Sequence, residues 1–140
     1  MKKQLVVLLG LGLLVGMSAY AQTVNLKADV PFNFIISGAT LPAGEYTMRE
    51  LGAGSAIAIR GPNPKANTVV LSQRCASLNA AKQSKLVFHQ YGDRYFLAQL
   101  WVAGSDSGRQ LAKSPREMEV ARDFTVQDVV LYAALHRASD

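Results

Sequence analysis

The sequence predicts a mainly β fold: an antiparallel β-sandwich or small barrel with one short helix in its C-terminal half. Short runs of alternating apolar and polar residues recur along the chain, and turns rich in glycine and proline separate them. One pair of runs, residues 85–102, has the form of a two-stranded hairpin, and a capped helix start follows at Ser114. About six short strands with turns between them are typical of a sandwich or barrel.

The first strands of the predicted domain lie on either side of Pro31. Apolar residues alternate from Val24 to Val30, and the period of two resumes from Phe32 to Ile36. Proline has no N–H to donate to a strand ladder, so it marks an edge, a bulge or a break. The pattern therefore predicts two short strands, or one strand that is kinked at Pro31.

Turn-forming residues at positions 37–46, 52–54 and 61–64 separate three further strands. In the first of these strands, Tyr46 and Met48 lie on one side, as the period of two requires.

Cys75 is the only cysteine, so an intramolecular disulfide is excluded. It follows the β-branched run of residues 68–74, which predicts a strand. Alternation places Cys75 on the same side of this strand as Val69 and Leu71. We therefore expect a buried and unreactive thiol rather than one that pairs with another chain.

The clearest local signal is the hairpin, in which two β-rich runs are joined by Gly92-Asp93. A two-residue turn of this kind needs a positive φ angle, which Gly92 supplies. The expected register pairs Tyr91 with Arg94, His89 with Phe96, Phe88 with Leu97 and Leu86 with Gln99.

Both faces of this hairpin are substantially apolar. One face carries Leu86, Phe88, Gln90, Tyr95, Leu97, Gln99 and Trp101. The other carries Lys85, Val87, His89, Tyr91, Arg94, Phe96, Ala98 and Leu100. A strand that faces solvent on one side is apolar on the other side only. The second face must therefore be covered by another part of the chain, line a cavity or meet a partner.

A helix start that could supply this cover is Ser114-Pro115-Arg116-Glu117, in which serine caps the helix and glutamate completes a capping box. We expect a short helix to about Arg122, with Met118 and Ala121 on its apolar side. The tail, residues 124–137, fits either a helix or a strand, because its apolar spacing is helical but its Val-Val-Leu-Tyr run is typical of a strand. We favour the strand.

Residues 1–21 have the three parts of a cleavable secretory signal peptide. Lys2 and Lys3 give a positive start, residues 5–17 are mostly aliphatic, and residues 19–21 read Ala-Tyr-Ala, the small residues that signal peptidase requires. A membrane-spanning helix needs about 20 apolar residues, so an uncleaved anchor is the less favoured interpretation.

The remaining chain, residues 22–140, has the length of a single domain. Loss of Lys2 and Lys3 with the signal lowers the net charge from +5 to +3, which is no nucleic-acid footprint. No second long apolar segment is present, so we expect a mature chain that does not span a membrane and that is exported to the periplasm or out of the cell.

No recognisable catalytic, metal-binding or cofactor-binding motif is present in the sequence. His89 has no His, Cys or carboxylate at metal-ligand spacing. Glu117 and Glu119 are two residues apart and do not face each other on a helix, so we assign them to capping and solvation. We therefore expect no catalytic residues, no metal and no cofactor, and we do not expect an enzyme.

Four segments carry a resemblance to other chains: Val30-Pro31-Phe32-Asn33-Phe34, the turn Leu41-Pro42-Ala43-Gly44-Glu45-Tyr46-Thr47, the hairpin at residues 88–97 and the helix start at residues 114–117. With these segments the chain resembles a loose group of small exported bacterial β-sandwich proteins. The resemblance covers most of residues 22–140. It implies a secreted β domain and brings no catalytic residues.

Two functional hypotheses follow from the apolar character of both hairpin faces. The first is a non-catalytic cell-envelope protein that binds a protein partner, or associates with itself, through an exposed aromatic surface; its candidate residues are His89, Tyr91, Phe96 and Trp101. The second is a small β-barrel that binds an apolar ligand in an internal cavity lined by Leu86, Phe88, Leu97 and Trp101.

Overall fold

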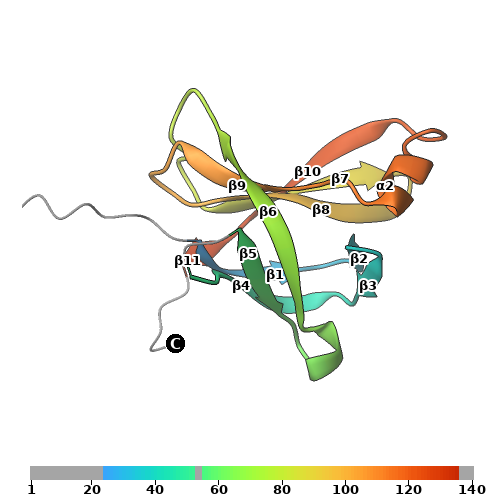
Figure 1. Ribbon diagram of the computed structural model, residues 1–140, viewed down its shortest axis with the longest axis horizontal. Helices are drawn as coiled ribbons and strands as arrows, with labels where there is room; N and C mark the ends of the chain where they lie inside the picture. The colour runs from blue at the N-terminus through green and yellow to red at the C-terminus, as the bar shows by residue number, and fades with distance from the viewer. Residues whose placement is uncertain (1–23, 53–54, 136–140) are drawn as a thin grey trace, which may run out of the picture.

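The computed structural model describes residues 24–52 and 55–135, which fold into two layers of β-strands (Figure 1). One layer holds β1 (Asn25–Val30), β4 (Gly44–Glu50), β5 (Ala56–Arg60) and β11 (Ala134–Leu135). The other holds β2 (Phe34–Ile36), β3 (Ala39–Leu41), β7 (Lys85–Tyr91), β8 (Arg94–Trp101), β9 (Ser107–Leu111) and β10 (Val126–Tyr132). The long strand β6 (Thr68–Ala76) crosses between the layers and pairs with both.

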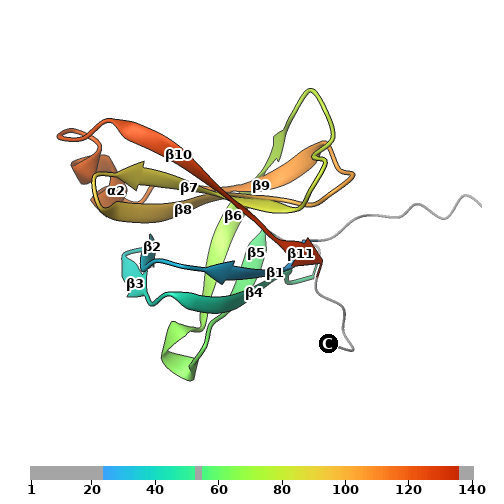
Figure 2. The same ribbon diagram turned by 180° about the vertical axis from the view of Figure 1, so that it is seen from behind.

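The described strands form one continuous sheet in the order β10-β7-β8-β9-β6-β5-β4-β1-β11, with β2 and β3 branching from β8. The sheet is not closed into a barrel. The predicted mainly β fold is confirmed, and of the two predicted architectures the open, two-layered one is present. The C-terminal strands reach both ends of the sheet, because β10 pairs with β7 and the short β11 pairs with β1 (Figure 2).

The break between β1 and β2 falls at Pro31, as the alternation predicted. After β3, the turn into β4 is held by two hydrogen bonds. The Tyr46 hydroxyl donates to the Pro42 carbonyl at 2.5 Å, and the Ala43 N–H donates to the Asn33 side chain at 2.9 Å. Tyr46 can therefore be fully buried, because its one polar group has a partner.

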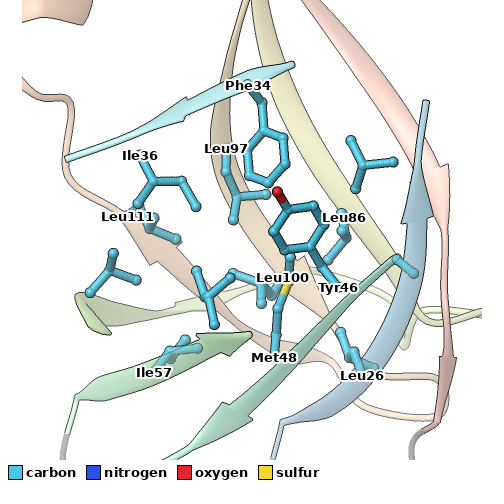
Figure 3. Packing of buried hydrophobic residues seen from close by; sticks show 14 of the residues in the cluster. Leu26, Phe34, Ile36, Tyr46, Met48, Ile57, Leu86, Leu97, Leu100 and Leu111 are labelled. Atoms are coloured by element: carbon cyan, nitrogen blue, oxygen red, sulfur yellow. The ribbon is translucent and has the colours of Figure 1, made fainter. Parts of the chain in front are cut away.

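The core lies between the two layers and is filled by side chains from both (Figure 3). Tyr46, Met48, Ile57 and Leu26 of the first layer meet Leu86, Leu97 and Leu100 of the second. Leu86, Phe88 and Leu97, which a barrel would place around a ligand cavity, belong to this packed core. At one end of the sandwich the Arg109 guanidinium pairs with Glu50 and links β9 to β4.

The β7–β8 hairpin forms with Gly92 at φ +61° in its turn, as predicted. Its register is as expected from the turn to the pair Phe88–Leu97, and there a β-bulge interrupts the ladder. Beyond the bulge Leu86 pairs with Leu100 rather than with Gln99, so that prediction is wrong. Ala98 of β8 has no partner on β7. Beyond this extra residue, the side chains of β8 lie on the opposite face from the one that an uninterrupted ladder would give them.

The bulge exchanges the faces of two predicted residues. Leu100 lies in the core with Leu86, although the uninterrupted register placed it on the His89 side. Trp101 pairs with Lys85 and Gly108 and lies on the opposite face from Leu86 and Leu100. We call the face of β7 and β8 that carries His89, Tyr91 and Phe96, turned away from the core, the outer face.

The helix α2 (Pro115–Val120) begins where the capping pattern predicted, and the Ser114 hydroxyl accepts a hydrogen bond from the Glu117 N–H. It ends two residues earlier than expected. Its buried residues are Glu117 and Val120, whereas Met118 and Ala121 are exposed, so the predicted apolar side is wrong. Val120 packs with Tyr91 and Phe96, and α2 thereby covers one end of the outer face.

Two further expectations concern Cys75 and the tail. Cys75 is only half-buried, and Val69 and Leu71 on the same side of β6 are exposed, so the prediction of a buried thiol is wrong. The reason is that Val70 and Ser72, on the other side of the strand, face the core. The favoured strand in the tail is confirmed as β10.

The expected signal peptide lies outside the described residues, as do positions 136–140. Within residues 24–52 and 55–135, no helix is both long and apolar enough to cross a membrane.

Candidate functional site

The structure brings three of the four predicted binding residues together and separates the fourth. Tyr91 and Phe96 are 1% and 2% exposed beneath α2, and His89 is partly buried beside them. Trp101 lies towards the other end of the hairpin, where its ring occupies the space above Gly108. The outer face is thus covered by the chain itself and does not present these aromatic rings to solvent.

A cluster of ionisable side chains lies under α2. The Glu117 carboxylate oxygen Oε2 accepts a hydrogen bond from the Tyr91 hydroxyl at 2.9 Å and lies 2.8 Å from His89 Nδ1. Glu117 is 4% exposed, so its assignment to capping and solvation is only half right: its N–H donates to the capping Ser114 hydroxyl, but its carboxylate is buried rather than solvated. On the other side of the imidazole, Asp128 Oδ1 lies 3.8 Å from His89 Nε2.

Sequence reasoning missed this cluster because its members come from three separate elements. Glu117 is on α2, His89 and Tyr91 are on β7, and Asp128 is on β10, where it pairs with His89 across the ladder. The one available signal was that Glu117 is followed by Val120 at helical spacing, which places a carboxylate on the buried side of the helix.

The chemistry of the cluster favours a role in holding α2 on the sheet. Burial and the hydrogen bond to Glu117 raise the pKa of Tyr91 to about 12, so the phenol remains a donor. An activated nucleophile needs a hydroxyl or thiol within hydrogen-bond reach of the base. In the described part of the chain, the polar partners of the His89 ring are two carboxylates, Glu117 and Asp128.

The same part of the chain contains no group of three or more His, Cys, Asp and Glu side chains that could hold a metal ion. The contacts of the Glu117 carboxylate with Tyr91 and His89 join the helix α2 to the strand β7.

A groove of about 640 Å³ lies next to this cluster, between β6 and β2. Its walls are β2 with the turn that follows it, residues 69–71 of β6, Phe96 and Leu97 of β8, and residues 111–117. The volume falls within the range of about 300–1,000 Å³ that is usual for ligand sites. We call this feature the groove.

The groove exists because β9 does not extend along the whole of β6. It ends at Leu111, opposite Ser72, and leaves the first residues of β6 without a partner on that side. The ladder between β6 and β9 extends from Ser72 to Ala76, and the chain leaves the sheet for α2 after Leu111. Residues 68–71 of β6 continue alone on that side, while their other side pairs with β5. In Figures 1 and 2, β2 lies on the side of the molecule that carries α2. We call residues 68–71 the free half of β6.

The side chains around the groove are apolar on its floor and charged at one end. Val70, Leu97 and Leu111 form the floor and belong to the core, whereas Val69 and Leu71 on the edge are 58% and 73% exposed. At the end where the chain enters α2, the groove is lined by the two exposed cations Lys113 and Arg116. Sequence analysis missed this site, although three consecutive apolar residues at 69–71 indicate a strand that is apolar on both sides.

A second hollow lies at the opposite end of the outer face, among Ser77, residues 79–83, Lys85, Gln99, Trp101 and Tyr132. Most of the residues that line it have polar side chains, and Trp101 is only 8% exposed because the ring lies on Gly108. A substituent at Gly108 would meet the Trp101 ring at 2.7 Å, so this glycine lets the ring lie flat on β9. The indole N–H donates to the Gln99 side chain at 3.0 Å. The Trp101 ring therefore packs on β9 and is not exposed as a binding surface.

Comparison with models of protein families, with curated proteins and with solved structures gave no match. Functional inference therefore rests on the geometry of the groove and of the ionisable cluster.

Proposed function

We propose that the protein is an exported, non-catalytic β domain that acts by binding in the cell envelope, and that the groove is its binding site. The observation that carries the proposal is the exposure of Val69 and Leu71 along a concave, apolar-floored site. Single exposed apolar side chains are common on protein surfaces. Two of them that line one groove, above core residues, indicate a site that is completed by a ligand.

The absence of a cover on these side chains has an energetic cost. Full burial of a valine or leucine side chain stabilises a protein by about 1.5–3 kcal/mol, and Val69 and Leu71 do not obtain the whole of this gain. A ligand that covers Val69 and Leu71 would recover part of it, which is a driving force for binding.

A binding role fits the ionisable cluster better than a catalytic one. Glu117 lines the groove, but its Oε2 atom is already hydrogen-bonded to Tyr91 and lies against His89. A catalytic acid or base needs a proton-transfer atom directed at the substrate. Glu117 instead lines the groove with its carboxylate held in place by Tyr91 and His89.

Export is proposed on the pattern of residues 1–21, a positive start, an apolar run and an Ala-Tyr-Ala end. Cell fractionation, with mass analysis of the recovered protein, tests it. Recovery of a chain that begins at Gln22 outside the cytoplasm supports export, and recovery of the full-length chain in the cytoplasm contradicts it.

Binding to the groove can be tested with 1-anilinonaphthalene-8-sulfonate, an apolar dye with one negative charge. We expect saturable fluorescence enhancement, and we expect Leu71→Lys to weaken it about tenfold by placing a charge on the groove wall. Leu78→Lys is the matched control, because Leu78 is fully exposed in a loop away from the groove. Equal dye binding by both variants and the parent protein would contradict the proposal.

A further inference from the structure

We infer that the ligand of the groove is an extended, acidic polypeptide segment that adds to the free half of β6 as an extra strand. This inference rests on the proposed function, because it names the class of ligand for the same groove. Three features support it: an unpaired strand edge, the alternation of side chains along that edge, and the charge at one end of the groove.

The first feature is the unpaired edge. The Ser72 N–H donates to the Ser55 carbonyl at 2.8 Å, so Ser72 directs its backbone groups towards β5. Backbone groups of successive residues in a strand point to opposite sides, and Val69 therefore directs its N–H and C=O into the groove. Among the described strands, none pairs with residues 68–71 on that side. A polypeptide strand can satisfy these groups, whereas an alkyl chain cannot.

The second feature is the arrangement of side chains along the unpaired side of β6, beyond the end of β9. β9 lies between β6 and β8 as far as Leu111. Beyond it β2 pairs with β8, at Ile35 and Phe96, and no described strand pairs with residues 68–71 of β6 on this side. An added strand would continue the ladder of β9 along β6. Its side chains would alternate between the apolar floor, at Val70 and Leu97, and the exposed side, at Val69 and Leu71. A ligand with apolar residues at alternate positions fits this arrangement.

The third feature is charge. Lys113 and Arg116 line the groove and are exposed, and the acidic residue beside them, Glu117, is occupied by its bonds to the cluster. The net charge near the entrance to α2 is thus positive, which favours an acidic ligand. A second copy of this chain fits less well, because the strand edge that it would add, β6, has no acidic residue to pair with these cations.

The test uses synthetic peptides of about eight residues in which valine alternates with threonine. Two of the peptides are acidic: one carries two glutamates at its N-terminal end and the other carries them at its C-terminal end. Two further peptides carry lysines in place of these glutamates. We expect micromolar binding of one acidic peptide by calorimetry and at least about tenfold weaker binding of the lysine peptides. Methylation of the alternate backbone nitrogens that face β6 should abolish binding. Methylation of the other set of alternate nitrogens should leave binding intact, because these nitrogens point away from β6.

Variants of the protein test the same contacts from the other side. Lys113→Glu combined with Arg116→Glu should weaken the acidic peptide about tenfold or more. Lys82→Glu combined with Arg94→Glu makes the same change in net charge outside the groove and should leave binding unchanged. Val69→Pro removes the N–H that faces the groove without removing a bond to β5, and Val69→Thr retains it.

The outcomes separate this inference from the function on which it rests. Binding of the dye and of dodecanoate, with no binding of any peptide, would overturn the inference and leave the groove as a site for small amphiphiles. A dimer in sedimentation experiments that Val69→Pro dissociates would overturn it in favour of a second copy. Failure of the dye and of every peptide to bind would remove the proposed function itself.

Discussion

The outer face of β7 and β8 and the free half of β6 are both apolar where a simple sandwich strand would be polar, and only one of them is covered. On the outer face, α2 places Val120 against Tyr91 and Phe96, and these side chains are nearly inaccessible. On β6, Val69 and Leu71 remain exposed. An apolar pattern on both sides of a strand therefore predicts a cover, but the cover can belong to the chain or to a ligand.

The two regions also differ in how their polar groups are satisfied. Under α2, the Glu117 carboxylate accepts the Tyr91 hydroxyl and faces the His89 imidazole, so the buried donors have a partner. Along the free half of β6, the backbone groups of Val69 face the groove. The covered region is complete within the chain, and the open one has polar and apolar groups that a ligand could satisfy.

The largest expected effect comes from Phe96→Ala, which empties the apolar cluster beneath α2. Removal of a buried phenylalanine side chain costs about 3–5 kcal/mol. Val69→Ala, at an exposed position of similar apolar character, should cost no more than about 0.5 kcal/mol. Urea unfolding of both variants measures the difference. Equal losses of stability would show that the two regions are covered to the same extent in solution.

The next largest effect is expected for Glu117→Ala. This change leaves the buried Tyr91 hydroxyl and His89 ring without their shared acceptor, which costs about 1–3 kcal/mol. Glu119→Ala is the matched control, because Glu119 is exposed on the same helix. Urea midpoints should shift for the first variant only. A comparable shift for Glu119→Ala would assign the loss to the removal of a negative charge from the helix rather than to the buried network.

The elements of this fold were largely predictable because their signals are local. Pro31 separates β1 from β2, Gly92 forms the hairpin turn, and Ser114 caps α2, and each signal acts within a few residues. The buried side of α2 was not predicted, because hydropathy favours Met118 over Glu117. Only the arrival of His89 and Tyr91 from β7 makes the carboxylate the buried group.

Register and edges were harder to predict than elements. The bulge in β8 that brings Leu100 into the core has no glycine or proline to mark it, so alternation alone placed Trp101 on the wrong face. The free half of β6 depends on where β9 leaves the sheet, at Leu111, which is a property of the tertiary arrangement. The candidate groove was for this reason absent from the sequence prediction, whereas Phe96, one of its walls, was present.

The covered region should also give a pH dependence that the open region lacks. The folded-state pKa of Tyr91, about 12, lies above the unfolded value of 10, so the unfolded chain releases this proton first. Stability should therefore be unaffected by Tyr91 below about pH 9 and should fall between pH 10 and 12, by at most about 1.4 kcal/mol per pH unit. Tyr91→Phe should remove this part of the decline in urea midpoints.

Two tyrosines provide the comparison for this measurement. Burial also raises the pKa of Tyr46, so part of the alkaline decline should remain after Tyr91→Phe. Tyr132→Phe, at an exposed position of β10, should leave the whole profile as it is in the parent protein. A profile that Tyr91→Phe does not alter would mean that the phenol is solvated and that α2 is not seated on β7.

The smallest expected effect, from Val69→Thr, is the sharpest test of the open region. Threonine keeps the branched shape of valine and its preference for strands, and the ladder partner Ala58 on β5 is unchanged. Because Val69 is more than half exposed, stability in urea should change by no more than about 0.5 kcal/mol. A loss above about 1 kcal/mol would mean that Val69 is packed in solution, either by closure of the groove or by another molecule. The dependence of that loss on protein concentration would then distinguish the two, since closure within one chain is independent of concentration and association is not.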